Sequence, residues 1–276
     1  MLDREDYIDP QCVLCGKPGE TESPKPVPMN RILEKLSQYE DRNDAQGAER
    51  HLKYWLAEAE MNRDGRGQLT LNNELMGHYR MRGMEEPARK HAEQALRLVR
   101  ELEMEETIAA GTTYINAATV REAFGTPEDA LPLFQLAREN YERNLPEDDA
   151  RLGGLYNNMG LGLCACGRYG ESEALFRKAI RLAAGFPERA LEEAVTWLNL
   201  ADLLAARDGE EAAEKEIAWC MEQAEKLLNS EAVPRDAYYA FVCEKCAPVF
   251  GHYGYFMQEA ELNRRAKGIR QEKAGH

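Results

Sequence analysis

Apolar and small residues recur along the chain in a pattern that predicts pairs of helices joined by short turns. The clearest copy is "YNNMGLGLCACGRYGESEALFRKAIRL", residues 156–182. Its apolar and small positions lie three or four residues apart on both sides of a turn glycine, Gly167. This spacing places them on one face of a helix, whereas a strand would alternate every second residue. The segment therefore predicts two helices that bury their apolar faces.

Further segments repeat this pattern in register. The clear copies are residues 72–96, 114–137 and 197–220, and weaker ones are residues 31–59 and the segment that ends near residue 270. The turn glycines Gly83, Gly125 and Gly167 are spaced 42 residues apart. A fixed period of this kind is typical of a solenoid, in which stacked units supply a core that no single unit could form.

The repeat resembles the tetratricopeptide repeat (TPR). The TPR consensus has, in order, a large residue, Leu, a small residue, an aromatic residue, a turn glycine, Ala, Phe and Ala. Those places are filled by Tyr156, Met159, Gly160, Leu163, Gly167, Ser172, Phe176 and Ala179. Leu163 replaces the aromatic residue and Ser172 the first alanine. The period exceeds the roughly 34 residues of the ordinary repeat, and it is similar to the longer repeats of kinesin light chains.

The resemblance covers about residues 29–270 and implies an all-α fold. We expect a right-handed TPR superhelix (α-solenoid) of about six helix-turn-helix repeats, whose first helices line a concave face. Small residues such as Ala118, Gly160 and Ala201 should let the two helices of a repeat approach closely. Phe134 and Phe176 should then fill the space between repeats.

Three parts are expected along the chain. Residues 1–28 form an extended proline-rich arm with a C-x-x-C turn, residues 29–270 form the solenoid, and residues 271–276 form a polar tail. The prolines of "SPKPVP" favour extended polyproline geometry in the arm. We expect the arm to lie along the solenoid as a tether, or as a competitor for a ligand.

The acidic composition narrows the possible partners and compartment. The chain has 35 Lys and Arg against 49 Asp and Glu, a net charge of −14, which disfavours binding to nucleic acid or an anionic membrane. The acidic start lacks the basic and apolar regions of a signal peptide. Seven cysteines, an odd number, lie in a chain too large to need disulfides. A cytoplasmic protein is predicted.

Asparagines recur at one position of the first helices. Asn116, Asn158 and Asn199 share a repeat position, and Asn73 is one residue off register. A carboxamide can pair with both groups of a peptide bond. In kinesin light chain and related peptide-binding repeats, asparagines at this place hold peptide backbone, so the resemblance implies that role here. Alternatively, each asparagine bonds a neighbouring helix and fixes the curvature. The predicted peptide-binding residues are Asn73, Arg80, Asn116, Thr119, Asn158, Asn199 and Asp202.

Two C-x-x-C pairs raise the question of a metal site. Cys12 and Cys15 precede a glycine in a segment rich in turn formers, as in a zinc knuckle. Cys243 and Cys246 fall on the positions of Tyr156 and Met159 in the repeat, which predicts core residues of a helix. The four cysteines could close a zinc site, or Cys12 and Cys15 could form an unliganded turn. No cofactor is expected unless these cysteines bind zinc.

The leading hypothesis is a non-enzymatic scaffold that binds a peptide or protein segment in the concave TPR groove. The alternatives are a bacterial peptide-sensing TPR regulator and a zinc-stabilised TPR module. An enzyme is not expected, because the histidines are scattered and neither H-E-x-x-H nor G-x-S-x-G occurs. The sequence is also compatible with a homodimer.

Overall fold

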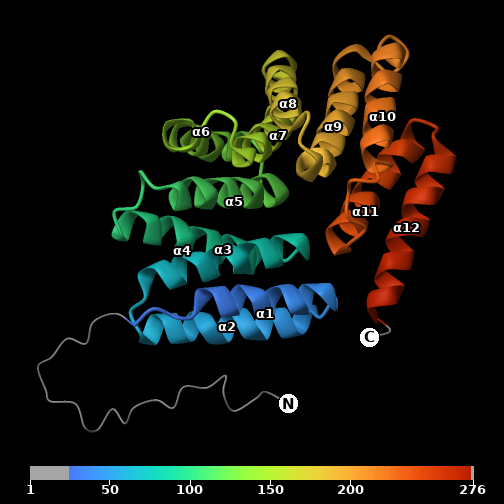
Figure 1. Ribbon diagram of the computed structural model, residues 1–276. Coiled ribbons are helices and arrows are strands. Elements are labelled where there is room, and N and C mark those ends of the chain that lie inside the picture. Colours follow the sequence, from blue (N-terminus) through green and yellow to red (C-terminus); the bar gives the residue numbers. More distant parts are fainter. Residues whose placement is uncertain (1–24, 275–276) are drawn as a thin grey trace, which may run out of the picture.

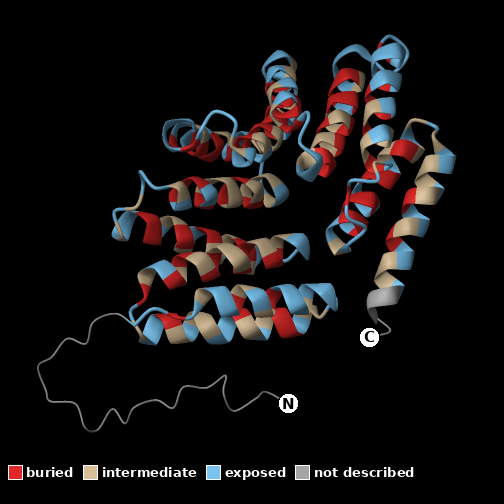
Figure 2. Cartoon of the chain, viewed as in Figure 1, coloured by how far each residue is buried: buried red, intermediate tan, exposed pale blue. Residues whose placement is uncertain are grey.

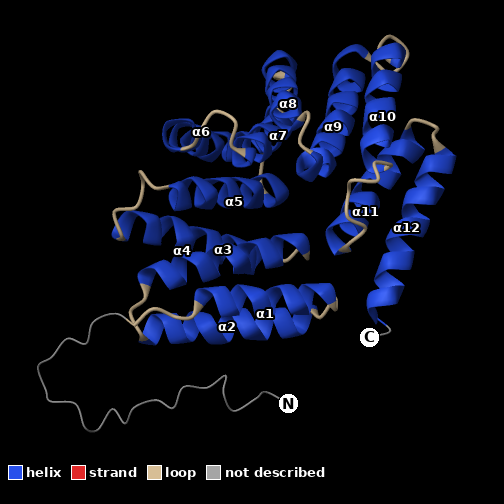
Figure 3. Ribbon diagram, in the orientation of Figure 1, coloured by secondary structure: helices blue, strands red, loops and turns tan. Residues whose placement is uncertain are grey.

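In a computed structural model, residues 25–274 are described, and this part of the chain is built from helices and loops without strands (Figures 1 and 3). The α-helices are α1 Met29–Asp41, α2 Ala45–Met61, α3 Gly65–Met81, α4 Glu85–Glu101, α5 Ile108–Phe124, α6 Pro127–Asn144, α7 Ala150–Ala165, α8 Tyr169–Ala183, α9 Ala190–Asp208, α10 Glu214–Leu228, α11 Ala237–His252 and α12 Phe256–Ala274. A short 3-10 helix, η3 Pro187–Arg189, precedes α9. The predicted all-α fold of six helix pairs is confirmed.

Each odd-numbered helix packs on the even-numbered helix that follows it, and the pairs follow one another along an arc from α1 to α12 (Figure 1). Odd-numbered helices also contact each other from pair to pair, from α3 through α5, α7 and α9 to α11. The even-numbered helices make no contact of comparable extent with one another. The odd-numbered helices are therefore the inner layer of the arc, and the even-numbered helices are the outer layer.

The turns follow the predicted period only in part. Gly83 and Gly167 have φ values of 67° and 71°, a left-handed conformation that glycine adopts without a Cβ clash. Gly125 instead has a φ of −132°, because α6 begins two residues later at Pro127. In the first loops the same left-handed turn is made by Asn43 and Arg63, with φ values of 53° and 54°. The turn geometry is thus repeated even where the glycine is missing.

The predicted packing positions form the core (Figure 2). Phe134 and Phe176 are 0% exposed, and Ala118 and Ala201 are fully buried. A Cβ added at Gly160 would lie 2.6 Å from the Phe176 ring, so a side chain larger than hydrogen would not fit. Two clusters of buried side chains, one for each half of the chain, both include residues of α8, so the core runs through α8 without a break.

Both ends of the described chain depart from the boundaries expected for the arm and the solenoid. Val27 is buried and its N–H donates to the Asp64 carboxylate at 2.9 Å, and Lys25 N–H donates to Asn62 O at 3.3 Å. The end of the predicted arm therefore packs on the turn before α3. Helix α12 continues to Ala274, past the predicted solenoid boundary at residue 270. Between residues 25 and 274, no helix has both the length and the apolarity needed to cross a bilayer.

Candidate functional site

The partly exposed side chains of the odd-numbered helices form one surface, which we call the inner wall. Even-numbered helices cover the opposite side of each odd-numbered helix. The inner wall is therefore formed by side chains of the odd-numbered helices that point toward the next odd-numbered helix and remain partly exposed. The inner wall comprises Glu40, Asn73, Glu74, Arg80, Asn116, Thr119, Glu122, Asn157, Asn158, Glu192, Asn199, Asp202, Tyr238, Phe241 and Lys245. It includes the predicted peptide-binding residues, although the side chains of Thr119 and Asn158 make no hydrogen bond to another odd-numbered helix of the described chain.

Asn73 and Asn116 link α3 to α5. The Asn116 Nδ2 donates to Asn73 Oδ1 at 2.9 Å. The Asn73 Nδ2 in turn donates to Leu69 O at 3.0 Å and to Thr113 Oγ1 at 2.9 Å. At this position the asparagines bond a neighbouring helix, which was the alternative interpretation of the row. Asn116 still has its carbonyl oxygen and one N–H without a partner among the described residues, so a role toward a peptide is not lost.

Asn199 makes the equivalent link from α9 to α7, but with a residue that the sequence did not single out. Its Nδ2 donates to Asn157 Oδ1 at 2.8 Å. Asn158, which was predicted instead, is half-buried on α7, and its side chain makes no hydrogen bond with the described part of the chain. Asn157 lies one period of 42 residues before Asn199, which is the signal that could have identified it. The carboxamide of Asn158 keeps its full hydrogen-bonding capacity.

Arg80 and Glu122 face each other across the same α3–α5 contact. Burial lowers the pKa of Arg80, and the Glu122 carboxylate partly offsets this. Burial likewise raises the pKa of Glu122, and Arg80 opposes that shift. Thr119, between them and Asn116, donates its hydroxyl to Asn116 O at 2.8 Å within α5. This section of the inner wall is polar, and its groups mainly contact each other.

Two further carboxylates on the inner wall form no ion pair with a Lys or Arg among the described residues. Burial raises the pKa of Glu74 on α3, and the nearby Glu40 carboxylate on α1 raises it further. Burial also raises the pKa of Asp202 on α9, whose Oδ1 accepts the Tyr253 hydroxyl at 2.9 Å. Glu74 is half-buried, whereas Asp202 is exposed and lies near His252, and a positive charge would be bound favourably beside either carboxylate.

An aromatic pair on α11 is the feature of the inner wall that the sequence analysis missed. Tyr238 and Phe241 are 48% and 39% exposed, with ring centroids 6.4 Å apart and planes inclined by 20°. The Tyr238 hydroxyl donates to Glu192 Oε1 on α9 at 2.9 Å. Lys245 Nζ lies 5.7 Å from the centre of the Phe241 ring. Positions 238, 241 and 245 follow helical spacing on the face opposite the buried cysteines, and this could have shown that the aromatic rings face outward.

Cys243 and Cys246 lie in the core, as predicted from their repeat positions. They are 0% and 1% exposed on the buried face of α11. Burial raises the pKa of both thiols, that of Cys246 to about 12. Cys12 and Cys15 lie outside the described residues, so the zinc site that would join the two pairs stays a prediction. Within residues 25–274 no group of three His, Cys, Asp or Glu side chains is arranged to hold a metal ion.

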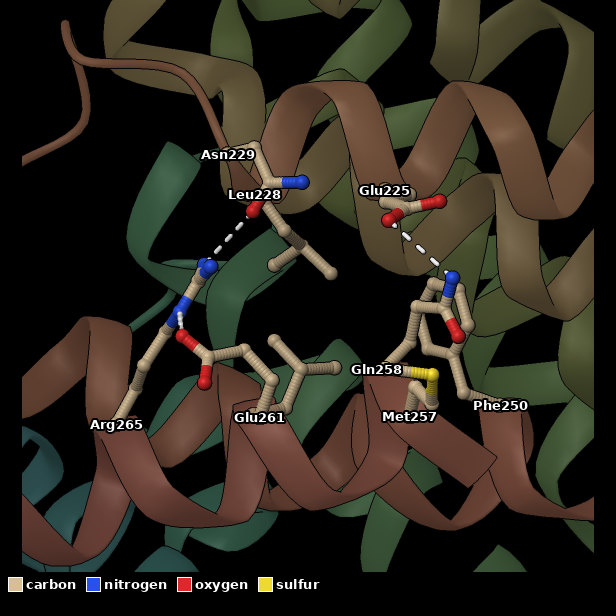
Figure 4. A pocket seen from close by; sticks show the side chains of 9 residues that line it. Glu225, Leu228, Asn229, Phe250, Met257, Gln258, Glu261 and Arg265 are labelled. Carbon is tan, nitrogen blue, oxygen red and sulfur yellow. Dashed lines mark hydrogen bonds and ion pairs between the residues drawn. The ribbon is translucent and has the colours of Figure 1, made fainter. Parts of the chain in front are cut away.

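Two shallow cavities involve the outer layer rather than the inner wall. One, of about 170 Å³, lies between α10, the end of α11 and α12, with Leu228 and Phe250 among its apolar walls (Figure 4). Its polar groups are paired with each other, since Arg265 bonds Glu261 at 2.7 Å. The other, of about 220 Å³, lies between α8, α9 and α10, next to Trp219. Neither cavity contains any of the predicted binding residues.

Comparison with known proteins identifies the fold. No protein-family profile matches the chain, and no curated protein matches it by sequence. Among solved structures, kinesin light chain TPR-like repeats from Podosopora anserina share 16% identity with a TM-score of 0.51, covering 74% of this chain and 96% of theirs. BtubC (BKLC) from P. vanneervenii shares 16% identity with a TM-score of 0.50, covering 91% and 94%.

A third similar structure is Rap protein complexed with competence and sporulation factor, at 15% identity and a TM-score of 0.52, covering 88% of this chain and 75% of that one. At this level of identity the similarity concerns the fold. The chain has the fold of TPR-type repeat proteins, and the fold predicted from its spaced small and aromatic residues is confirmed.

Proposed function

We propose that the chain is a non-enzymatic protein-interaction scaffold that binds an extended peptide or protein segment along the inner wall. The exposed pair Tyr238 and Phe241 carries this proposal. Two large rings lie side by side and remain 48% and 39% exposed, although Tyr238 bonds Glu192, and aromatic side chains contribute much of the binding energy at protein interfaces. The fold supports it too, since Rap, a structural neighbour, was solved with competence and sporulation factor bound.

The asparagines supply the second component of such a site. Asn158 has no intramolecular partner in residues 25–274, and Asn116 and Asn199 use only part of their hydrogen-bonding capacity. A segment anchored at α11 and running toward α5 would pass these carboxamides, which can pair with its backbone whatever its sequence. We propose the cytoplasm as the compartment, on the argument from the cysteines.

The proposal is tested by selecting random phage-displayed peptides on the full chain. Enriched peptides are then titrated by fluorescence anisotropy against the unmodified chain and the double variant Tyr238→Ala/Phe241→Ala. Because two aromatic anchors would be lost, we expect the affinity to fall at least about tenfold. Circular dichroism checks that the variant is folded.

Trp219→Ala is the matched control, since Trp219 is an aromatic side chain, 55% exposed, on the outer-layer helix α10. It should leave the affinity unchanged. Failure to enrich any peptide would refute the proposal. So would an affinity that the inner-wall variant leaves intact or that the control reduces equally.

A further inference from the structure

The charged side chains of the inner wall are mostly acidic. The carboxylates are Glu40, Glu74, Glu122, Glu192 and Asp202, and the cations are Arg80 and Lys245. Arg80 lies opposite Glu122, and Lys245 lies over the Phe241 ring. Glu40 on α1 lies near Arg82, and Asp202 on α9 lies near His252 and accepts the Tyr253 hydroxyl, but Glu74 on α3 has no basic side chain acting on it among the described residues, and the carboxylates outnumber the cations.

We propose that the segment bound along the inner wall is cationic, with an apolar or aromatic side chain on the Tyr238–Phe241 pair and Lys or Arg side chains over Glu74 and Asp202. This inference rests on the proposed function and specifies the chemistry of the ligand. Glu74 is half-buried and Asp202 exposed, and both carboxylates lose hydration when a ligand covers them, so they need an opposite charge from that ligand. A neutral or acidic segment would cover them at a cost in affinity.

The position of Lys245 gives the bound segment a direction. Its ammonium group beside Phe241 disfavours a second cation next to the aromatic pair. The cationic residues of the ligand are thus directed away from α11, toward Asp202 on α9 and, farther along, Glu122 and Glu74. The apolar anchor and the basic residues of the segment should accordingly be separated in its sequence.

Charge also disfavours two ligands that the protein itself could supply to the inner wall, namely its own residues 1–24 and a second copy of the chain. Residues 1–24 hold two basic and six acidic residues, a net charge of −4. A second copy of the chain carries −14. Either would bring like charge to an acidic surface, which is unfavourable. A basic partner is the occupant that the wall complements.

The test uses the peptides from the same selection. We expect the enriched sequences to carry net positive charge together with an aromatic or large apolar residue. The triple variant Glu74→Gln/Glu122→Gln/Asp202→Asn should bind them about tenfold more weakly at low salt, and the difference should shrink at high salt because ions screen the pairs.

The matched control removes the same three negative charges from the outer layer, as Glu93→Gln/Glu139→Gln/Glu222→Gln. All three residues are exposed, on α4, α6 and α10, and the affinity should stay within about twofold because exposed, distant charges are screened. Neutral or acidic enriched peptides, or equal losses in both triple variants, would overturn the inference. Peptides that depend on Tyr238 and Phe241 but not on the acidic triad would leave the proposed function standing and remove only the cationic preference. If no peptide is enriched, both fail.

Discussion

Two sections of the inner wall occupy comparable places in the repeat but differ in what their side chains contact. Between α3 and α5, Asn116 bonds Asn73, and Arg80 faces Glu122. Between α9 and α11, the Tyr238 hydroxyl bonds Glu192, but the rings of Tyr238 and Phe241 remain 48% and 39% exposed. The first section directs its polar groups to the neighbouring helix, whereas the second leaves large apolar surface uncovered.

The difference shows that one row of repeat positions can serve two purposes. Hydrogen bonds between inner helices hold adjacent repeats in a fixed arrangement, and each such bond contributes about 1 kcal/mol at most when water can replace it. Exposed aromatic surface contributes nothing to folding, but its burial by a partner is favourable at roughly 25 cal/mol per Å². Stability and binding should therefore respond to different substitutions along the same wall.

The largest expected effect separates folding from binding within helix α11 itself. Phe250 is 0% exposed and Phe241 39% exposed. Phe250→Ala should lower the free energy of unfolding by about 3–5 kcal/mol, because it leaves a cavity in the core. Phe241→Ala should change it by less than about 1 kcal/mol, the worth of an exposed contact with Lys245. Urea unfolding followed by circular dichroism measures both. Similar losses would mean that the aromatic pair is structural.

A second prediction concerns α7, which lies between the two sections. Gly160→Ala places a Cβ 2.6 Å from the Phe176 ring, so α7 and α8 must move apart. Overpacking of this kind should cost about 1–3 kcal/mol, measured by thermal or urea unfolding.

The control lies on the same helix. A Cβ added at Gly154 meets nothing within 4 Å, so Gly154→Ala should stabilise the chain by up to about 1 kcal/mol through helix propensity. Equal effects at the two glycines would show that Gly160 is not needed for the close approach of α7 and α8.

The sequence could predict the fold because packing constrains residue size. Only small residues suit the place of Gly160 and only large rings fill the place of Phe176, so the pattern survives in a single sequence. Turns were less predictable. Gly125 was expected to match Gly83, yet the extended backbone before Pro127 set its conformation, while Asn43 made the left-handed turn without glycine.

The site was harder to predict because it depends on one-residue differences in register. Asn157 and Asn158 are adjacent, and an alignment of Asn199 with Asn158, one residue away from the 42-residue period, selected Asn158, although Asn157 is the one that reaches Asn199. The aromatic pair was missed for a related reason. The two cysteines of α11 identify its buried face, but the significance of Tyr238 and Phe241 follows only once the opposite face is known to lie on the inner layer.

A third prediction tests whether the α3–α5 section stabilises the solenoid. Asn73 donates to Leu69 O and Thr113 Oγ1 and accepts from Asn116. Asn73→Ala removes all three bonds, but water can reach the partners, so the loss should be about 1 kcal/mol. The same change at Asn158, which has no intramolecular bond in the described chain, should fall within about 0.5 kcal/mol. Chemical unfolding distinguishes the two, and a larger loss at Asn158 would contradict the assignment.

The smallest expected effect has the opposite sign and depends on pH. The pKa of Glu74 is raised from 4.5 by burial and by Glu40, so the folded chain holds this proton more tightly than the unfolded chain. The resulting stability is present below pH 4.5 and is lost as the pH rises through the folded-state pKa. Glu74→Gln stays neutral, so it should stabilise the chain at pH 7 by up to about 0.5 kcal/mol and give a smaller gain at pH 4. Urea unfolding at both pH values measures this difference. A gain of equal size at both pH values would mean that the effect comes from side-chain packing. It would then argue against a cationic ligand for the inner wall, because the Glu74 charge would not be destabilising.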